Sequence, residues 1–242
     1  MKYQGSKARI VSSILPLMLD DDRTSFVDVF CGGCNVIAEV PMRYDRYAND
    51  ANVYLMSMWE ALVDSSVFLP RNISVEKWDW YRRVFKACED GQIVVSDKGK
   101  AMIGWCGYMA SRNGRFFEDG YSGKCGKRDY IAEAVRNIWR QSCKLRGVKF
   151  SMCDYRDMYI PDNSIIYCDP PYDGKKMKGY IRNIVRDEFW DWCREMSSMG
   201  HKVYVSEYSA PDDFECIWDK PVKCTIAPKK TYRRTERLFT LE

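Results

Sequence analysis

The chain has 242 residues, of which 46% are hydrophobic, and its formal net charge at pH 7 is +4. This length and composition suit one large globular domain with an insert better than two independent domains. Because no apolar stretch could cross a bilayer and the N-terminus lacks a signal-peptide pattern, we expect a soluble, cytoplasmic protein with no membrane partner.

Strand-like and helix-like patterns alternate along most of the chain. Apolar runs predict strands near 26–30, 46–49, 148–152, 164–168 and 202–206, and amphipathic patterns predict helices near 6–19, 34–40, 51–63 and 187–198. Such alternation predicts a mainly parallel sheet covered on both faces. The interval from about 70 to 146 interrupts it, with expected helices near 74–88 and 130–145 and a glycine-rich polar loop between them.

A glycine pair follows the first expected strand. Phe26 to Phe30 is apolar and leads directly into Cys31-Gly32-Gly33. Glycines at a strand-to-helix turn let the backbone approach a ligand closely, and a helix N-terminus behind them favours polar or anionic groups. Asp50 ends the second expected strand, a position from which a carboxylate reaches ribose hydroxyls in doubly wound sheets. We therefore expect a nucleoside-containing cofactor here.

The most informative motif is Asp169-Pro170-Pro171-Tyr172, which follows the apolar run from Ile165 to Cys168. The Asp169 carboxylate and the Pro170 carbonyl can each accept one hydrogen of an exocyclic amino group, while Tyr172 stacks on the ring. This arrangement fits direct in-line transfer of a methyl group from a sulfonium donor to the amino nitrogen, without a metal or covalent intermediate. The alternative is a proline turn that merely closes a core.

Eleven cysteines are scattered along the chain, and His201 is the only histidine. Cys31 and Cys34 form a C-x-x-C pair, which elsewhere suggests a redox pair or half of a zinc site. There is no second such pair, so we interpret the cysteines as small core residues and expect no metal.

Two further segments complete a family pattern. Tyr3-Gln4-Gly5-Ser6-Lys7 opens the chain, and the run from Phe150 to Tyr155 places Asp154 at the end of a strand-like segment. Along the chain these motifs follow one another as the Tyr3–Lys7 segment, the glycine pair, Asp50, Asp154 and the Asp169 motif. With this set and order of motifs, the chain resembles the Dam-like, D12-class DNA adenine methyltransferases, and more narrowly their bacteriophage members. The resemblance covers nearly the whole chain, including residues 33–37, 50–62, 120–123, 205–211 and 234–239. The aspartate at position 169 favours adenine over cytosine.

The resemblance implies an α/β fold, a Rossmann-like S-adenosylmethionine-dependent methyltransferase sheet with a mostly helical target-recognition insert. The catalytic domain would comprise residues 1–69 and 147–242, with the insert at 70–146. A final antiparallel hairpin would come from 222–226 and 236–241.

The resemblance also implies roles for individual residues. Tyr3 would stack on S-adenosylmethionine, and Lys7 would act by charge on the carboxylate of its methionine part. Asp50 would bind the ribose and Asp154 the adenine edge of the cofactor, in a site completed by Asp28, Phe30, Gly32, Gly33 and Asp169. The catalytic set would be Asp169, Pro170, Pro171 and Tyr172. The alternative for the Tyr3–Lys7 segment is a helix cap with a solvated lysine, and for Asp154 a plain helix cap.

Basic residues gather in three places and could neutralise DNA phosphates. Arg112, Asn113 and Arg115 are of types that read guanine and adenine. The other basic positions are Lys124, Lys127 and Arg128 in the insert, Lys175, Lys176 and Lys178 after the tetrad, and Lys229, Lys230, Arg233 and Arg234 near the end. Phe116, Phe117 and Tyr121 could wedge into DNA or form the core of the insert.

We expect an orphan, phage-like enzyme that methylates a flipped adenine in double-stranded DNA, with the loop at 173–180 closing over the base and no obligate protein partner evident. Protection against host restriction is predicted from the phage resemblance. The chain departs from the family at Lys175-Lys176 and Ile184-Val185, which affects loop closure more than reaction type. The alternatives are a catalytically silent DNA- or cofactor-binding module, or an RNA adenine or DNA cytosine amino methyltransferase.

Overall fold

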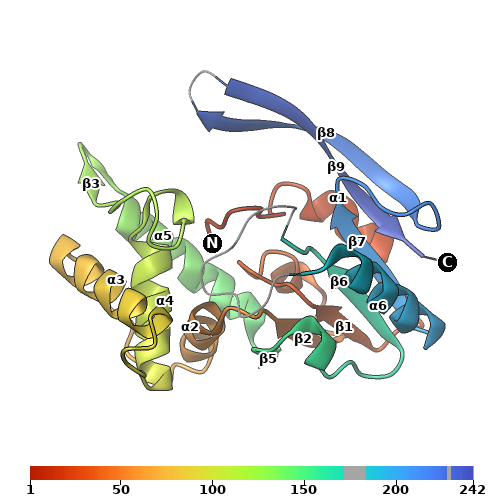
Figure 1. Cartoon of the computed structure of the whole chain (residues 1–242), viewed down its shortest axis with the longest axis horizontal. Helices are drawn as coiled ribbons and strands as arrows, with labels where there is room; N and C mark the ends of the chain where they lie inside the picture. Colours follow the sequence, from red (N-terminus) through yellow and green to blue (C-terminus); the bar gives the residue numbers. More distant parts are fainter. Residues whose placement is uncertain (172–183, 228–229, 242) are drawn as a thin grey trace.

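The computed structural model describes residues 1–171, 184–227 and 230–241, without the side chains of 223–227 and 230–234. Within this part of the chain a seven-stranded sheet runs in the order β5-β2-β1-β6-β7-β9-β8 (Figure 1). Five neighbouring strands are parallel: β5 (Lys149–Ser151), β2 (Asp45–Asn49), β1 (Ser25–Asp28), β6 (Ser164–Cys168) and β7 (Lys202–Glu207). The long hairpin of β8 (Glu215–Ala227) and β9 (Lys230–Thr240) adds two antiparallel strands.

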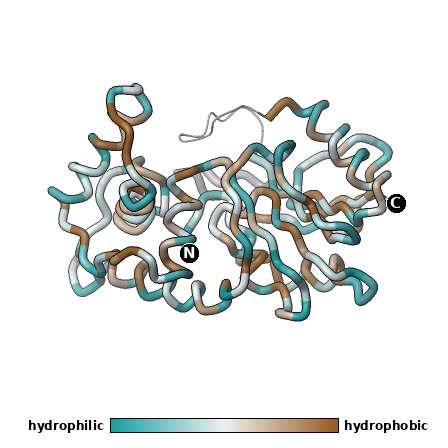
Figure 2. The backbone as a smooth tube through the Cα atoms, turned by 90° about the horizontal axis from the view of Figure 1, so that it is seen from below, coloured by the Kyte–Doolittle hydropathy of each residue, from teal (hydrophilic) through white to brown (hydrophobic). Residues whose placement is uncertain are grey.

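Both faces of the parallel strands are buried. Phe26 and Ile165 contribute to a hydrophobic cluster with α1 (Val11–Met18) and α2 (Val53–Val63), whereas Val27 and Ile166 contribute to a second cluster with α6 (Arg186–Ser198). Figure 2 shows hydrophobic stretches of the backbone, in brown, in the part of the molecule that holds the sheet. Continuous apolar runs are typical of parallel strands covered on both faces, which explains why β1 and β6 show no alternation of polar and apolar residues.

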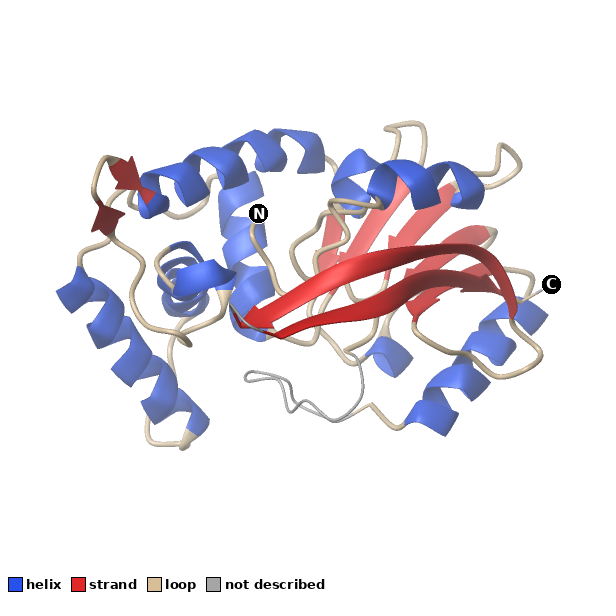
Figure 3. Ribbon diagram, turned by 90° about the horizontal axis from the view of Figure 1, so that it is seen from above, coloured by secondary structure: helices blue, strands red, loops and turns tan. Residues whose placement is uncertain are grey.

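The helical insert packs beside the sheet rather than on it (Figure 3). It contains α3 (Val75–Glu89), α4 (Asp97–Met109), the short turns η2 (Arg112–Gly114) and η3 (Cys143–Leu145), and α5 (Tyr130–Ser142). A two-stranded ribbon of β3 (Lys124–Cys125) and β4 (Arg128–Asp129) lies at its rim. Ser74, Ser96 and Asp129 cap the three helices through their side chains, which satisfies backbone N–H groups that a helix start leaves open.

Helix α4 corrects one expectation, because the sequence suggested a glycine-rich polar loop between the two helices of the insert. Gly99, Gly104 and Gly107 lower the helix propensity of this stretch. Tertiary packing requires glycine at position 104, because a Cβ there would lie 2.1 Å from the carbonyl oxygen of Tyr54 in α2. The helix backbones of α2 and α4 thus approach closely, and tertiary contact overrides local propensity.

Three other boundaries differ from expectation. The helix expected at 34–40 is only the short turn η1 (Ile37–Glu39), after Cys34 adopts a φ of 52°. Helix α1 begins at Val11 rather than near residue 6, and the final hairpin is much longer than 222–226 and 236–241. The remaining expected strands and helices are present, with their ends shifted by a few residues. A short turn, η4 (Tyr155–Asp157), follows β5.

The strand order reverses between β1 and β6. From β1 the chain proceeds to β2 and then β5 on one side, and it returns to form β6 and β7 on the other. In open parallel sheets ligands bind outside the carboxyl ends of the strands at such a reversal. Among the described residues, no helix is long and apolar enough to cross a membrane.

We predict that Gly104→Ala destabilises the protein. The added methyl must displace the backbone of α2, and overpacking of this kind costs about 1–3 kcal/mol, more than the roughly 1 kcal/mol of helix propensity gained. Urea unfolding should show this loss. Lys98→Ala, an exposed change in the same helix, should leave the free energy of unfolding nearly unchanged. Equal stability of Gly104→Ala and wild type would contradict the close approach.

Candidate functional site

The carboxyl ends of β1 and β6 lie side by side. Asp28 pairs with Tyr167 across the two strands, and the N–H of Val29 donates to the carbonyl of Tyr167 at 3.0 Å. Asp169 leaves β6 two residues after Tyr167, so it emerges beside the glycine turn that follows β1. The glycine turn and Asp169 are therefore neighbours at the strand reversal, although more than 130 residues separate them in the chain.

The glycine turn forms a surface of bare backbone covered by Tyr3. Gly32 has a φ of +46°, and a Cβ there would lie 2.6 Å from Cε1 of Tyr3. A Cβ on Gly33 would lie 2.8 Å from the Cβ of Tyr3. The indole N–H of Trp59 donates to the carbonyl of Gly32 at 3.1 Å, and the amide of Gln141 in α5 donates to that of Gly33 at 2.7 Å. Both glycines are thus required by space, and the turn is held from two sides.

Asp50 lies directly after β2 and is only 1% exposed. Its carboxylate accepts the N–H of Gly32 at 3.1 Å and the N–H of Asn52 at 2.9 Å. Asp50 therefore orients the glycine turn through backbone N–H groups, and its expected contact with ribose hydroxyls remains a prediction.

Asn49 has a structural role at this edge of the sheet that the sequence analysis did not assign. Its side-chain amide donates to the carbonyls of Val29 and Cys153 at 3.2 and 3.0 Å, and its carbonyl accepts the N–H of Cys153 at 3.1 Å. One buried side chain thereby joins the ends of β1, β2 and the segment after β5. The signal available in the sequence was an asparagine at the end of an expected strand.

Lys7 and Asp169 form an ion pair at the centre of the site. The Lys7 ammonium lies 2.6 and 2.8 Å from the two carboxylate oxygens, and it also donates to the carbonyl of Gly5 at 3.2 Å. The side chains are only 4% and 18% exposed. Lys7 is therefore not a solvated lysine. Its expected contact with the methionine part of S-adenosylmethionine remains a prediction.

The rest of the Asp169 motif is described only in part. Pro170 is buried and Pro171 half-buried. Tyr172 lies outside the described residues, as do Lys175, Lys176, Lys178 and the loop expected to close over a base.

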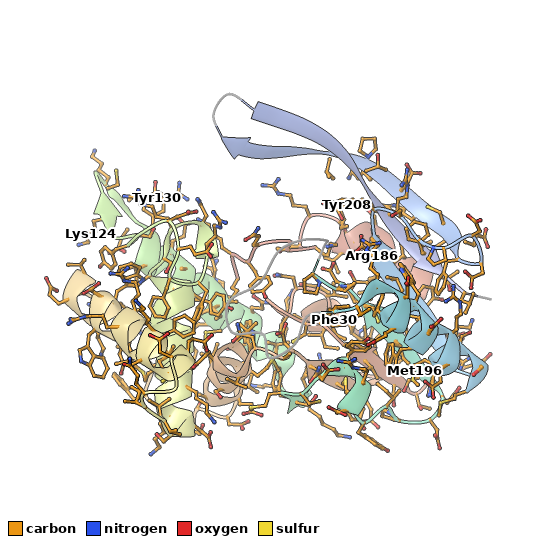
Figure 4. All side chains as sticks on the ribbon, in the orientation of Figure 1. Phe30, Lys124, Tyr130, Arg186, Met196 and Tyr208 are labelled. Carbon is orange, nitrogen blue, oxygen red and sulfur yellow. The ribbon has the colours of Figure 1, made fainter. Side chains whose placement is uncertain are left out.

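Glu207 and Arg186 are a second pair that the sequence analysis did not assign. Cys168 at the end of β6 pairs with Val205 of β7, so Glu207 lies level with the Asp169 turn. The Glu207 carboxylate is 3% exposed, lies 3.1 Å from Arg186 and accepts the N–H of Tyr208 at 2.8 Å. Figure 4 shows Arg186 and Tyr208 on the side of the sheet where the β8–β9 hairpin begins. A buried glutamate one strand away from Asp169 thus fixes the start of α6.

The remaining cofactor candidates have contrasting environments. Phe30 packs its ring against Tyr155 and Phe189, at centroid distances of 5.6 and 5.9 Å. Asp154 caps η4 and binds the guanidinium of Arg156 at 2.8 and 2.9 Å. The structure therefore gives Asp154 the helix-cap role, and its contact with a cofactor adenine remains a prediction.

Asp28 is almost fully buried at the end of β1. Burial raises the pKa of its carboxyl well above the ordinary value, and the nearby Asp169 and Asp50 raise it further. The backbone N–H of Ile37 and the ammonium of Lys7 act in the opposite direction. Burial likewise raises the pKa of Cys31 and Cys34. Because only a thiolate is a metal ligand or strong nucleophile, this C-x-x-C pair fits the core interpretation.

The candidate DNA contacts in the insert divide into a group of exposed side chains and a group of arginines held in ion pairs. Arg112 and Asn113 are exposed on η2, and Lys124 and Lys127 are exposed on the β3–β4 ribbon; Figure 4 shows Lys124 at its rim. Arg115 instead binds Asp119 at 2.9 Å and Glu118 at 3.2 Å.

Arg128 binds Glu133 at 2.7 Å and lies over the ring of Tyr130. Phe116 and Phe117 are buried against Phe85, so they form core rather than a wedge. Tyr121 packs on Trp78 and donates its hydroxyl to the carbonyl of Ile73.

Residues 3–89 match the family described as D12 class N6 adenine-specific DNA methyltransferase. The matched part includes Tyr3, Lys7, the glycine turn and Asp50, and it ends before Asp169.

We predict that Lys7 and Asp169 are energetically coupled. Lys7→Met leaves a partly buried carboxylate without its ammonium, so we expect a loss of about 1–3 kcal/mol in the free energy of unfolding. Adding Asp169→Asn removes the orphaned charge and should restore most of that loss in a double-mutant cycle measured by urea unfolding. Lys2→Met, at an exposed lysine, serves as the control. Additive effects of the two changes would contradict the coupling.

We also predict a specific pH dependence from Asp28. Because its pKa in the folded protein is raised, the folded state binds more protons than the unfolded state between the ordinary value of 3.8 and the folded value. Stability contributed by this group is therefore present below pH 3.8 and is lost as pH rises through that interval. Asp28→Asn should flatten the dependence and increase stability most at alkaline pH, as thermal unfolding from pH 5 to 9 would reveal. A parallel offset at every pH would be the contrary result.

Proposed function

We propose that the chain transfers a methyl group from S-adenosylmethionine to the N6 amino nitrogen of an adenine flipped out of duplex DNA. The match of residues 3–89 to the D12 class of N6 adenine-specific DNA methyltransferases supports this proposal. Enzymes of this class depend on S-adenosylmethionine. The observation that carries the proposal is the position of Asp169 beside the glycine turn at the strand reversal, because donor and acceptor sites must adjoin for in-line transfer.

The residues on the donor side fit the cofactor. The glycine turn offers backbone that a side chain would obstruct, Tyr3 packs across it, and Asp50, which orients the turn, would bind the ribose hydroxyls. Phe30 and the segment at Asp154 border the same edge of the sheet. When bound, S-adenosylmethionine supplies an electrophilic methyl group on a sulfonium sulfur.

On the acceptor side, Asp169 and Pro170 would hold the adenine amino group. Each accepts one N–H hydrogen, which withdraws the nitrogen lone pair from conjugation and directs it toward the methyl carbon. Positive charge develops on the nitrogen during transfer, and the carboxylate stabilises it in a largely dry site. Lys7 fixes the plane of that carboxylate before the base arrives. Tyr172 would stack on the ring.

The target base must leave the helix, because its amino group is otherwise paired and out of reach. The exposed side chains of Arg112, Asn113, Lys124 and Lys127 are suited to contacts with the surrounding duplex. Arg115 and Arg128 would first have to exchange their acidic partners for phosphates or bases. The polar contacts of the insert thus divide into groups ready for DNA and groups that require rearrangement.

We predict that Asp169→Asn abolishes methyl transfer, with a fall in kcat of at least about 100-fold, since the asparagine loses the charge that stabilises the developing cation. Transfer of labelled methyl groups to duplex DNA, followed by nucleoside analysis, would measure rate and product together. The matched control is Asp162→Asn, an exposed change before the same strand, which should retain activity.

The substrate class is tested by the same assay on single-stranded DNA and RNA. N6-methyladenine formed chiefly in duplex DNA supports the proposal. Methylcytosine or a preference for RNA would overturn it, and bound S-adenosylmethionine without any transfer would identify a silent binding module. Single-molecule sequencing of DNA from cells expressing wild-type and Asp169→Ala chains would give the recognition sequence.

A further inference from the structure

The β8–β9 hairpin extends far beyond the sheet that anchors it. Strand β9 pairs with β7 only over Arg237–Thr240, whereas β8 and β9 continue to pair with each other from Lys220 opposite Glu236 to Ala227 opposite Lys230. We call residues 220–227 and 230–236 the arm. With about 3.3 Å per residue, it is roughly 25 Å long. Figures 1 and 3 both show it passing over the N-terminal segment toward the helical insert.

The base of the arm is firmly attached. Ile217 and Trp218 pack against the larger hydrophobic cluster, and the carboxylate of Glu236 lies 3.9 Å from the Lys7 ammonium. The arm therefore begins at the ion pair of Lys7 and Asp169. Further out, its strand pairing in the described residues is internal, and an isolated two-stranded ribbon is only marginally stable in water. Such a ribbon needs a partner surface.

The charge of the arm indicates what that partner is. Between Asp219 and Glu236 the sequence has six basic residues and no acidic residue, more positive charge than the +4 of the whole chain. The strand register also places two basic residues opposite each other, because Lys223 of β8 pairs with Arg233 of β9. Like charges directly opposite each other in an antiparallel pair are destabilising. A polyanion alongside the ribbon would remove that penalty.

Protection of a free sheet edge explains only part of this pattern. Edge strands commonly carry proline and lysine to prevent pairing with other chains, and Pro221 and Lys220 in β8 meet that need. It does not call for a second cation opposite Lys223, nor for Arg233 and Arg234 in succession on the partner strand. Lys220, at the base, is opposite Glu236, so the unbalanced charge lies further out.

We propose that the arm is a duplex-DNA contact that binds backbone phosphates on the side of the catalytic site opposite the β3–β4 ribbon. This inference rests on the proposed function for its choice of partner. A two-stranded ribbon has the width that a DNA groove admits. The arm and the insert contact the DNA on two sides of the target base. The arm supplies binding affinity that does not depend on the DNA sequence.

The test removes three arm cations together in the full chain: Lys223→Gln, Lys230→Gln and Arg233→Gln. The matched control removes three exposed cations from the segment before α3 and from α3 and α4: Arg71→Gln, Lys86→Gln and Lys98→Gln. Dissociation constants for a random-sequence duplex are measured by fluorescence anisotropy at several NaCl concentrations. The arm variant should bind roughly tenfold or more weakly, and the slope of log affinity against log salt should fall by about 0.9 per lost phosphate contact.

Two further readouts keep the result interpretable. The thermal unfolding midpoint and S-adenosylmethionine affinity of the arm variant should match those of wild type, which shows that the fold is intact. An unchanged salt slope, or an equal loss in the control variant, overturns the proposal. Dissociation of a wild-type dimer into monomers by the arm changes, seen in sedimentation, also overturns it, because the arm would then serve self-association.

The outcome is separable from that of the proposed function. If the arm variant loses salt-dependent DNA binding while wild type methylates no adenine, the arm assignment stands and the proposed reaction fails. If wild type methylates duplex adenine and the arm variant binds and methylates equally well, the reaction stands and the arm assignment fails.

Discussion

The parallel register of β1 against β6 is the constraint on which the site depends. It places Asp28 opposite Tyr167 and so brings the glycine turn and Asp169 out of the sheet at the same edge. A shift by one residue would turn every side chain of a strand to the other face. Because both faces of these strands are packed, Phe26 with one cluster and Val27 with the other, such a shift would disrupt two cores. The hydrophobic core therefore fixes the geometry of the polar site.

At this edge several carboxylates lie close together in a poorly solvated region. Asp50 accepts backbone N–H groups, Asp169 pairs with Lys7, and Glu207 pairs with Arg186 and accepts a backbone N–H. The pKa of Asp28 is raised by burial and by its acidic neighbours, and the ammonium of Lys7 opposes this shift only in part. Burial of charge is tolerated where a partner is present and otherwise favours the neutral form. The same arrangement leaves Asp169 oriented at the mouth of the site.

The helical insert and the arm lie outside the parallel sheet, and each is joined to it at a few positions. The insert has its own aromatic core around Phe85, Phe116 and Phe117, and it connects to the sheet through α2 and through Gln141 at the glycine turn. The arm is joined to the sheet at its base and carries unbalanced positive charge beyond it. Both lie at the periphery of the parallel sheet, and surface loops and ribbons of this kind are where recognition commonly resides.

The sequence by itself determined the mainly parallel sheet, most of its strands and helices, and the glycine, Asp50 and Asp169 motifs, because these depend on local hydrophobic period and turn chemistry. The reversal of strand order between β1 and β6 is known only from the tertiary structure. It did not determine the partner of Lys7, the joining role of Asn49 or the buried pair of Glu207 and Arg186, since these contacts link residues far apart in the chain. Helix α4 was missed because Gly104 lowers local helix propensity, while close packing on α2 requires that glycine. The length of the arm was also underestimated, because strand pairing, not composition, decides where a ribbon ends. Local chemistry thus fixed which residues could act, and tertiary packing decided which of them meet.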